Sequence, residues 1–355
     1  MTDTEIIQSI LYTIITLGIL FSPLIIYLIE KKKRASLIDR YLKVFNEPSE
    51  AYEAYERDQM NLYVEEPHKK RSILAIVYYA LVFYIISEVA SFVAIQIYLG
   101  VNGFSQEIIN PDSPMFNQDV YNHMASILNL VLQVVIYGIG TIGVVIFMWK
   151  PFIEDLKKTN KKVFAYGAMG LGLAYGGNVI ATIILEVLGV TEIKGTASNQ
   201  EAINSMFDQP LWGLALLFIV IVILAPIIEE LVFRKAIFTL IKNKNLALTV
   251  SSLVFGALHC VSTAIIVLQA CFQGEATYLD FIIELIYILP YSLMGLGLGL
   301  CYIKGNRNIG TSIFAHMLNN GISFFASILL LKLEETGLLD ELEMIIFNLL
   351  EQKWF

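Results

Sequence analysis

Eight long apolar segments, separated by short polar ones, make up most of this chain. They lie at roughly 6–29, 72–99, 124–149, 163–189, 211–240, 246–270, 279–303 and 309–332. Each is long enough to cross a bilayer, because a membrane-spanning helix needs about 20 apolar residues. The pattern therefore predicts an all-α fold, a polytopic transmembrane helical bundle of about eight spans that has the lipid bilayer as its partner.

Composition supports this interpretation and excludes other classes of protein. Of 355 residues, 56% are hydrophobic and 16% are charged, and the mean hydropathy is +0.66. No continuous basic surface is present, so we expect no nucleic-acid partner. The three cysteines show no C-x-x-C spacing, which argues against a disulfide framework and a zinc finger.

The distribution of Lys and Arg predicts the orientation of the spans. The segments 30–71, 150–162, 234–244 and 304–307 carry 21 of the 24 basic residues. Short loops rich in Lys and Arg stay in the cytoplasm. We therefore expect a cytoplasmic loop at 30–71 and both termini on the opposite side of the membrane.

Two adjacent glutamates interrupt the apolar run at 211–240. Neighbouring residues on a helix point about 100° apart, so Glu229 and Glu230 face different surroundings. Glu230 precedes Arg234 by four residues, the favourable order for a helical ion pair, and this leaves Glu229 without a local partner. A charged side chain inside a span is costly, so an unpaired intramembrane carboxylate indicates a functional site.

Three further polar side chains lie inside spans at similar depths. Counted from the predicted cytoplasmic ends, His259 is about 13 residues (~20 Å) and His316 about seven residues (~10 Å) into its helix. Asn320 follows His316 by four residues and shares its face. Since Glu229 is about a dozen residues from its own cytoplasmic end, all four fit one site in the cytoplasmic half of the bilayer.

These residues carry a resemblance to a known family. The motifs Glu229-Glu230-x-x-x-Arg234, Phe255-x-x-x-His259 and His316-x-x-x-Asn320 resemble the three motifs of the CPBP family of intramembrane proteases. That family groups type II CAAX prenyl endopeptidases with bacterial bacteriocin-processing and self-immunity proteins. The stretch from Gly297 to Gly310 resembles the family's last conserved block, and the match covers roughly residues 211–325.

The resemblance implies a CAAX-protease-like intramembrane peptidase with a membrane-embedded cavity open to the cytoplasm. Such an enzyme hydrolyses a peptide bond of a membrane-embedded or lipidated peptide or protein by glutamate-activated water. By the same resemblance, Glu229 is the base and His259 assists it, while His316 and Asn320 stabilise the oxyanion. Glu230 and Arg234 support this site.

The resemblance leaves the cofactor open. The family carries the metalloprotease name, and His259 and His316 are the residues that would hold a metal ion here. Two imidazoles and a glutamate can bind zinc. Catalysis by a glutamate base does not require zinc, so a zinc ion is allowed but not demanded.

The expected organisation has three parts. Residues 1–210 hold four spans with the cytoplasmic loop at 30–71, residues 211–332 form a four-span catalytic core, and 333–355 form an amphipathic C-terminal tail. We expect an integral, multi-pass protein of a bacterial plasma membrane.

Two other functions compete with the protease. A non-catalytic immunity or scaffold protein would not use Glu229, and a proton-coupled transporter would use further intramembrane carboxylates. Glu88 and Glu284 lie deep in spans and would suit a proton relay, or would pair with polar side chains on neighbouring helices. These candidate partners are Asn129, Gln133 and Asn178. No H-E-x-x-H motif is present for a zinc protease of that type.

Overall fold

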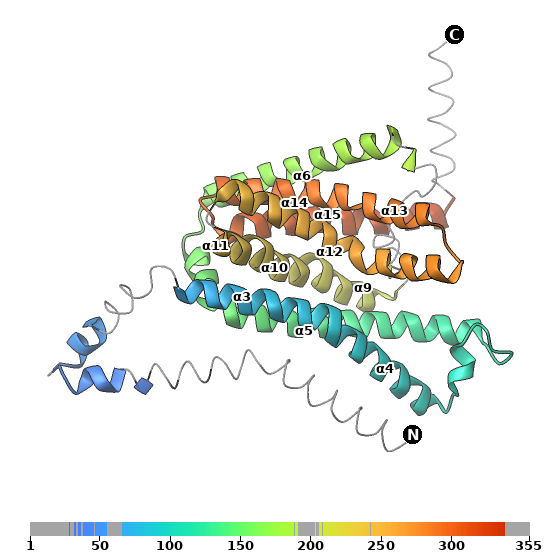
Figure 1. Cartoon of the computed structure of the whole chain (residues 1–355), viewed down its shortest axis with the longest axis horizontal. Helices are drawn as coiled ribbons and strands as arrows, with labels where there is room; N and C mark the ends of the chain where they lie inside the picture. Colours follow the sequence, from blue (N-terminus) through green and yellow to red (C-terminus); the bar gives the residue numbers. More distant parts are fainter. Residues whose placement is uncertain are drawn as a thin grey trace, which may run out of the picture.

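The computed structural model describes residues 66–187, 209–241 and 243–337, together with scattered positions within 28–54 and 189–207. Within these ranges the chain is helical (Figure 1). The helices are α3 (Glu66–Leu81), η1 (Val82–Ile86), α4 (Ser87–Asn102), η2 (Gln106–Ile109), α5 (Gln118–Lys157), α6 (Lys161–Val187), α9 (Leu211–Phe218), η3 (Ile219–Leu224), α10 (Ala225–Glu230), η4 (Leu231–Ala236), α11 (Ile237–Leu240), α12 (Lys244–Gln273), α13 (Tyr278–Ile286), α14 (Ile288–Lys304) and α15 (Ile309–Glu335).

Seven of the eight predicted spans are confirmed as helices long and apolar enough to cross a membrane. They are Lys69–Asn102, Gln118–Lys157, Lys161–Val187, Leu211–Leu240, Lys244–Gln273, Tyr278–Lys304 and Ile309–Leu333. The chain is therefore a multi-pass integral membrane protein with an all-helical fold. Almost all of the predicted span at 6–29 and most of the predicted tail at 333–355 lie outside the described residues.

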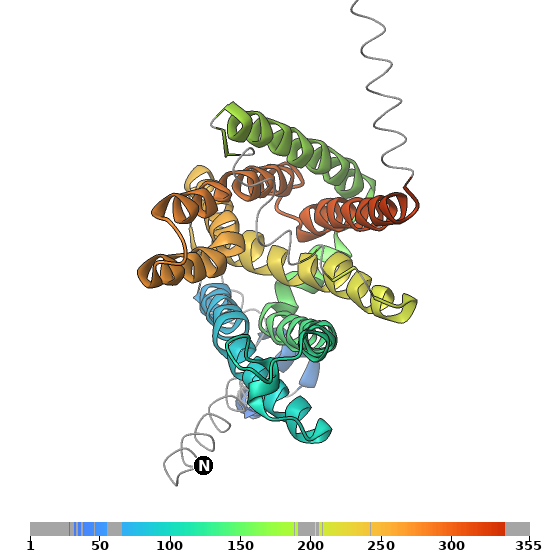
Figure 2. The same cartoon turned by 90° about the vertical axis from the view of Figure 1, so that its right-hand side faces the viewer.

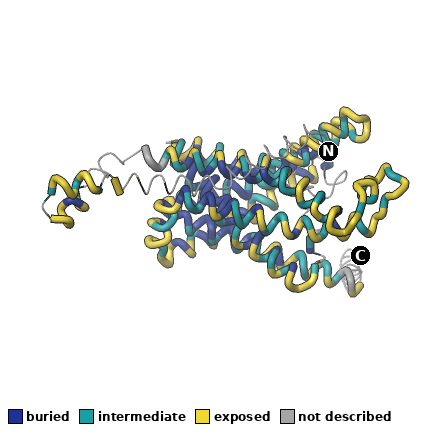
Figure 3. The backbone as a smooth tube through the Cα atoms, turned by 90° about the horizontal axis from the view of Figure 1, so that it is seen from below, coloured by how far each residue is buried: buried dark blue, intermediate teal, exposed yellow. Residues whose placement is uncertain are grey.

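The span with the two glutamates occupies the centre of the bundle. Figure 2 shows this yellow helix between the blue and teal helices α3 to α5 on one side and the red α15 on the other, with the green α6 outermost. Its residues Ile228, Leu231 and Phe233 are fully or almost fully buried. Figure 3 shows that buried residues gather toward the end of the bundle where α3 begins and α11 lies. The charged pair is thus surrounded by protein and not by lipid.

This central span is not a regular α-helix. Two π-helical turns, η3 and η4, flank the short α-helical stretch that contains Pro226, Glu229 and Glu230. Single π-turns inside helices occur frequently at functional sites. The π-turns change which residues share a face, because each turn holds more residues than an α-helical turn.

Small residues allow the helices around the central span to pack closely. A Cβ atom added at Gly297 on α14 would lie 2.8 Å from the backbone nitrogen of Ala174 on α6. A Cβ atom at Gly256 on α12 would lie 2.7 Å from the backbone oxygen of Ile288 on α14. Since neither backbone atom can move away easily, these two contacts fix α12, α14 and α6 against one another.

Asp155, near the end of α5, joins three parts of the chain. Its Oδ2 atom accepts hydrogen bonds from Lys235 Nζ at 2.5 Å and from the backbone N–H of Ile309 at 3.0 Å. Its backbone oxygen accepts a hydrogen bond from Asn308 Nδ2 at 2.7 Å. Asp155 therefore binds the start of α15 to the end of the central span.

The Asp155→Ala variant is expected to unfold at a clearly lower temperature than the wild type. The substitution leaves the largely buried Lys235 without its carboxylate and Ile309 without its acceptor. Breaking such a pair costs about 3 kcal/mol. Thermal unfolding in detergent measures the loss, and Glu154→Ala, which removes the exposed carboxylate next to it, is the matched control. Equal unfolding temperatures for the two variants would contradict the role given to Asp155.

Candidate active site

The predicted ion pair between Glu230 and Arg234 is confirmed. Arg234 Nη1 lies 2.9 Å from Glu230 Oε1, and both side chains are fully buried. Arg234 Nη2 also donates to the backbone oxygen of Gly295 at 3.1 Å, and its guanidinium group lies 4.6 Å from the centre of the Phe255 ring. A buried charge needs a partner and hydrogen bonds of this kind. Glu230 and Arg234 therefore form a fully buried ion pair whose position is fixed by contacts with Gly295 and Phe255.

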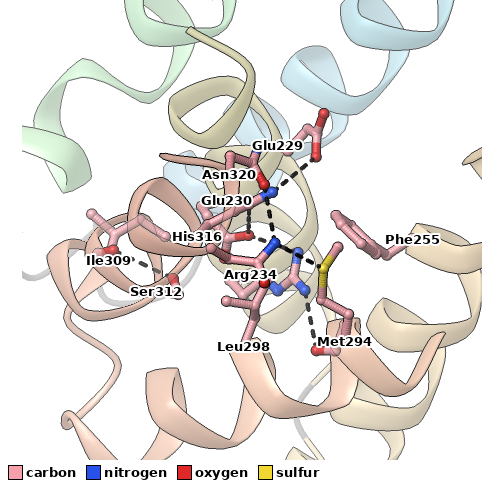
Figure 4. Close-up of polar contacts among 12 residues, drawn as sticks. Glu229, Glu230, Arg234, Phe255, Met294, Leu298, Ile309, Ser312, His316 and Asn320 are labelled. Atoms are coloured by element: carbon pink, nitrogen blue, oxygen red, sulfur yellow. Dashed lines mark hydrogen bonds and ion pairs between the residues drawn. The ribbon is translucent and has the colours of Figure 1, made fainter. Parts of the chain in front are cut away.

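His316, on α15, connects the two glutamates (Figure 4). Its Nδ1 lies 2.9 Å from Glu230 Oε1 and donates a hydrogen bond to it, since a carboxylate only accepts. Its Nε2 faces Glu229 Oε2 at 3.9 Å, which is too long for a direct hydrogen bond. One ring nitrogen is thus anchored and the other is directed at Glu229.

Glu229 differs from Glu230 in its surroundings. Glu229 is only 5% exposed, yet its Oε2 atom has no hydrogen-bond partner among the described residues. Buried polar atoms are normally hydrogen-bonded, so an unpaired carboxylate oxygen calls for an explanation such as a catalytic role or a bound water. The lack of a local cation for Glu229, inferred from the sequence, agrees with this geometry.

His259, on α12, lies beside this group. Its Nδ1 donates to the backbone oxygen of Phe255 at 2.7 Å, so the neutral ring has its lone pair on Nε2. The ring stacks on Tyr291 at 4.6 Å, and Phe255 lies 4.6 Å from His259 and 5.8 Å from His316. His259 also interacts electrostatically with Glu229. The structure thus brings together the two histidines and the two glutamates from three separate spans.

Asn320 reaches the same region, but one of its amide hydrogens is already used. Asn320 Nδ2 donates to the backbone oxygen of Ile221 in the π-turn η3 at 2.9 Å. Its oxygen accepts a hydrogen bond from Asn319 Nδ2 at 3.2 Å, and the Asn319 amide also contacts Met294 Sδ at 3.5 Å. An oxyanion role for Asn320 therefore has only its second amide hydrogen available in this arrangement.

Asn319 is a site residue that the motifs did not identify. It is 7% exposed and orients Asn320 through their shared hydrogen bond. A second amide next to the motif residue, inside an apolar span, was a visible signal in the sequence, because such a group needs a partner within the bundle.

The zinc site that the metalloprotease name allows is not supported. Within the described part of the chain, no group of three or more His, Cys, Asp or Glu side chains is arranged to hold a metal ion. Each histidine keeps one ring nitrogen that could bind a metal ion, as is usual for histidine ligands, but no third ligand is arranged with them within the described residues. These residues do not fit a zinc centre, so the steps proposed below do not use one.

The two other intramembrane carboxylates have different surroundings. Glu88, on α4, is exposed at the surface of the bundle. Glu284, on α13, is buried, and its Oε2 accepts a hydrogen bond from Thr263 Oγ1 at 3.2 Å. Thr263 is a partner that the sequence did not indicate. Glu284 is thus held by a side chain of α12.

Comparison with known proteins finds a family match for residues 211–322 of the chain. Residues 211–322 match the family model described as "Type II CAAX prenyl endopeptidase Rce1-like". An uncharacterized protein of Mycoplasma capricolum subsp. capricolum is 30% identical over 227 residues, which are 59% of this chain and 58% of that protein. UPF0177 protein YajF of Lactococcus lactis subsp. lactis is 34% identical over 85 residues, 23% of this chain and 41% of that protein. No solved structure matches significantly.

The chain therefore spans less than two thirds of the length of these relatives. The matched stretch, by contrast, contains all three polar motifs, from Glu229 to Asn320, and the helices α9 to α14 in full. Residues 211–322 thus form a domain of the Rce1-like type II CAAX prenyl endopeptidase family.

Proposed function

We propose that this protein is an intramembrane endopeptidase that hydrolyses a peptide bond of a membrane-embedded or lipidated peptide by means of water activated by Glu229. The observation that carries the proposal is the buried, unpaired Oε2 of Glu229, 3.9 Å from His316 Nε2. Membership of the Rce1-like family, whose name describes an endopeptidase, supports the same reaction class.

The spacing between Glu229 and His316 suits a shared water molecule. A water about 2.8 Å from each atom can bridge them from one side, because two hydrogen bonds of that length together exceed the 3.9 Å separation. The carboxylate removes a proton from this water as its oxygen bonds to the substrate carbonyl carbon. The same proton then passes from Glu229 to the leaving amine as the C–N bond breaks, which restores the carboxylate.

The other residues have supporting parts in this mechanism. His316 remains oriented because Nδ1 donates to Glu230, and Glu230 is held by Arg234. His259 lies beside Glu229 with Nε2 available, so it assists proton transfer. The oxyanion that forms at the substrate carbonyl needs hydrogen-bond donors in a dry site, where each is worth a few kcal/mol. Asn320 and His316 are the donors that the family resemblance indicates.

We further propose that the site is reached from the cytoplasm, in a bacterial plasma membrane. The basic segments 150–162, 234–244 and 304–307 all flank the helix ends nearest to Glu229 and His316. Positively charged loops remain cytoplasmic, so this end of the bundle faces the cell interior. The two relatives described above come from Mycoplasma and Lactococcus, which supports a bacterial membrane.

Hydrolysis in water enriched in ¹⁸O tests the proposal against a scaffold function. Membranes from cells that lack the protein are incubated with the purified wild type in detergent, and the peptides are analysed by mass spectrometry. Each product of hydrolysis is expected to carry one ¹⁸O at its new C-terminus. Glu154→Gln, altered at an exposed carboxylate of α5, should give the same labelled peptides. A folded wild type that yields no labelled product would contradict the protease and favour the scaffold.

A further inference from the structure

Three tyrosines outside the family domain lie on a group of helices that packs against the span carrying Glu229. Tyr79 lies on α3, Tyr84 on the π-turn η1 and Tyr137 on α5, and all three precede residue 211. Glu229 interacts electrostatically with each of the three phenol groups. The family motifs therefore describe only part of the surroundings of this carboxylate.

Ring contacts fix two of these tyrosines next to the central span. The Tyr79 ring meets the Phe233 ring edge-on at 5.6 Å, and Phe233 follows Glu229 by four residues. Phe83 stacks on Tyr79 at 4.6 Å and meets Tyr137 edge-on at 4.8 Å. Phe83 thus lies between the two tyrosines and holds both rings in place.

Backbone packing fixes the same helices against Glu229. One turn after Tyr137, an added Cβ atom at Gly140 would lie 3.1 Å from Ile228 Cδ1, the residue before Glu229. On the other side, Tyr84 Oη donates to the backbone oxygen of Leu258 at 3.3 Å, immediately before His259. The helices that carry the three tyrosines are therefore held by contacts with residues next to, or one turn away from, the proposed catalytic groups.

Several hydrogen-bonding groups of Glu229 and the nearby tyrosines have no partner within the described residues. In the part of the chain that the structure describes, the phenol oxygens of Tyr79 and Tyr137 make no hydrogen bond, and Glu229 Oε2 accepts none. Two unpaired phenol donors and one unpaired carboxylate oxygen therefore lie on helices that pack against one another. Together they can bind further polar groups, such as a water and a substrate carbonyl.

We propose that Tyr79 and Tyr137 donate hydrogen bonds to the carbonyl oxygen of the scissile peptide bond and stabilise the oxyanion formed there. This inference rests on the proposed function. A phenol suits the role, because it donates a strong hydrogen bond without bringing a second charge into the apolar interior. It also supplies donors that Asn320 lacks, since one Asn320 hydrogen is bound to Ile221.

The test compares Tyr79→Phe and Tyr137→Phe with Tyr78→Phe in the cleavage assay. Tyr78 neighbours Tyr79 and is also buried, but its hydroxyl donates to the backbone oxygen of Ile139 at 3.4 Å. Each of the two site variants is expected to lower kcat about 10²-fold with little change in KM, because an oxyanion donor acts mainly in the transition state. Tyr78→Phe is expected to keep the wild-type kcat.

Thermal unfolding of each variant separates a lost donor from damaged packing. The phenylalanines keep every ring contact, so all three variants should unfold near the wild-type temperature. If both site variants cleave at the wild-type rate while Glu229→Gln is inactive, the inference fails and the proposed function stands. If their kcat falls only together with the unfolding temperature, the inference also fails. An active Glu229→Gln would overturn the proposed function itself.

Discussion

Replacing Glu229 by glutamine is expected to abolish cleavage while the protein stays folded. The amide keeps the shape of the side chain but cannot take a proton from water, and a general base contributes about 10²–10⁴ to the rate. Glu229 Oε2 makes no hydrogen bond within the described chain, so the substitution removes no contact there. Its unfolding temperature should therefore equal or exceed that of the wild type, because an unpaired buried charge is costly.

Initial cleavage rates and thermal unfolding of the purified protein in detergent measure both parts of this expectation. Glu88→Gln is the matched control, since it makes the same change at an exposed carboxylate in another span. A transporter that uses Glu88 would lose uptake in this control, whereas the protease should keep its activity. Wild-type cleavage by Glu229→Gln would show that this carboxylate is not the base.

Arg234→Ala should have the opposite effect to Glu229→Gln. Its main effect should be on the stability of the fold and not on the catalytic step. It leaves the fully buried Glu230 without its cation and the backbone oxygen of Gly295 without its donor. Removing one partner of a buried ion pair costs about 3–5 kcal/mol. We expect a much smaller yield of folded protein and a lower unfolding temperature, measured beside Glu229→Gln under the same conditions.

A double variant separates the lost pair from lost packing. Glu230→Gln combined with Arg234→Met leaves no unpaired charge, and the glutamine oxygen can still accept from His316 Nδ1. Replacing a buried pair by neutral groups is often nearly neutral for stability. The double variant should therefore unfold at a higher temperature than Arg234→Ala. If Arg234→Ala alone unfolds at the wild-type temperature, the pair does not support the site as described.

The features that the sequence predicts correctly depend on local patterns. Seven spans follow from the length of apolar runs, and the pair of Glu230 with Arg234 follows from a spacing of four on a helix. The sequence predicts that His316 lies near Glu229, because both groups lie in the cytoplasmic half of their spans. The hydrogen bond between His316 and Glu230 is found only in the structure, in which one ring nitrogen binds Glu230 and the other faces Glu229.

The features that it misses depend on contacts between distant segments or on irregular helices. On a regular helix, Tyr79 and Tyr84 would point about 140° apart, because five residues turn the chain by 500°. The π-turn Val82–Ile86 changes this relation, and both phenols interact with Glu229. Likewise, no spacing in the sequence indicates that Asn320 binds the backbone oxygen of Ile221, 99 residues earlier.

The hydrogen bonds of Asp155 show that the family domain cannot be cut from the rest of the chain at Leu211 without loss of contacts. Leu211 begins the stretch that matches the family model, yet the first turn of α15 is completed by a carboxylate from α5. A fragment that starts at Leu211 would leave Lys235 and Ile309 without Asp155. If residues 1–210 and 211–355 were made as separate chains, they would have to associate before α15, which carries His316, regained the contact with Asp155. The folded structure of the family domain in this protein therefore depends on α5, which lies outside that domain.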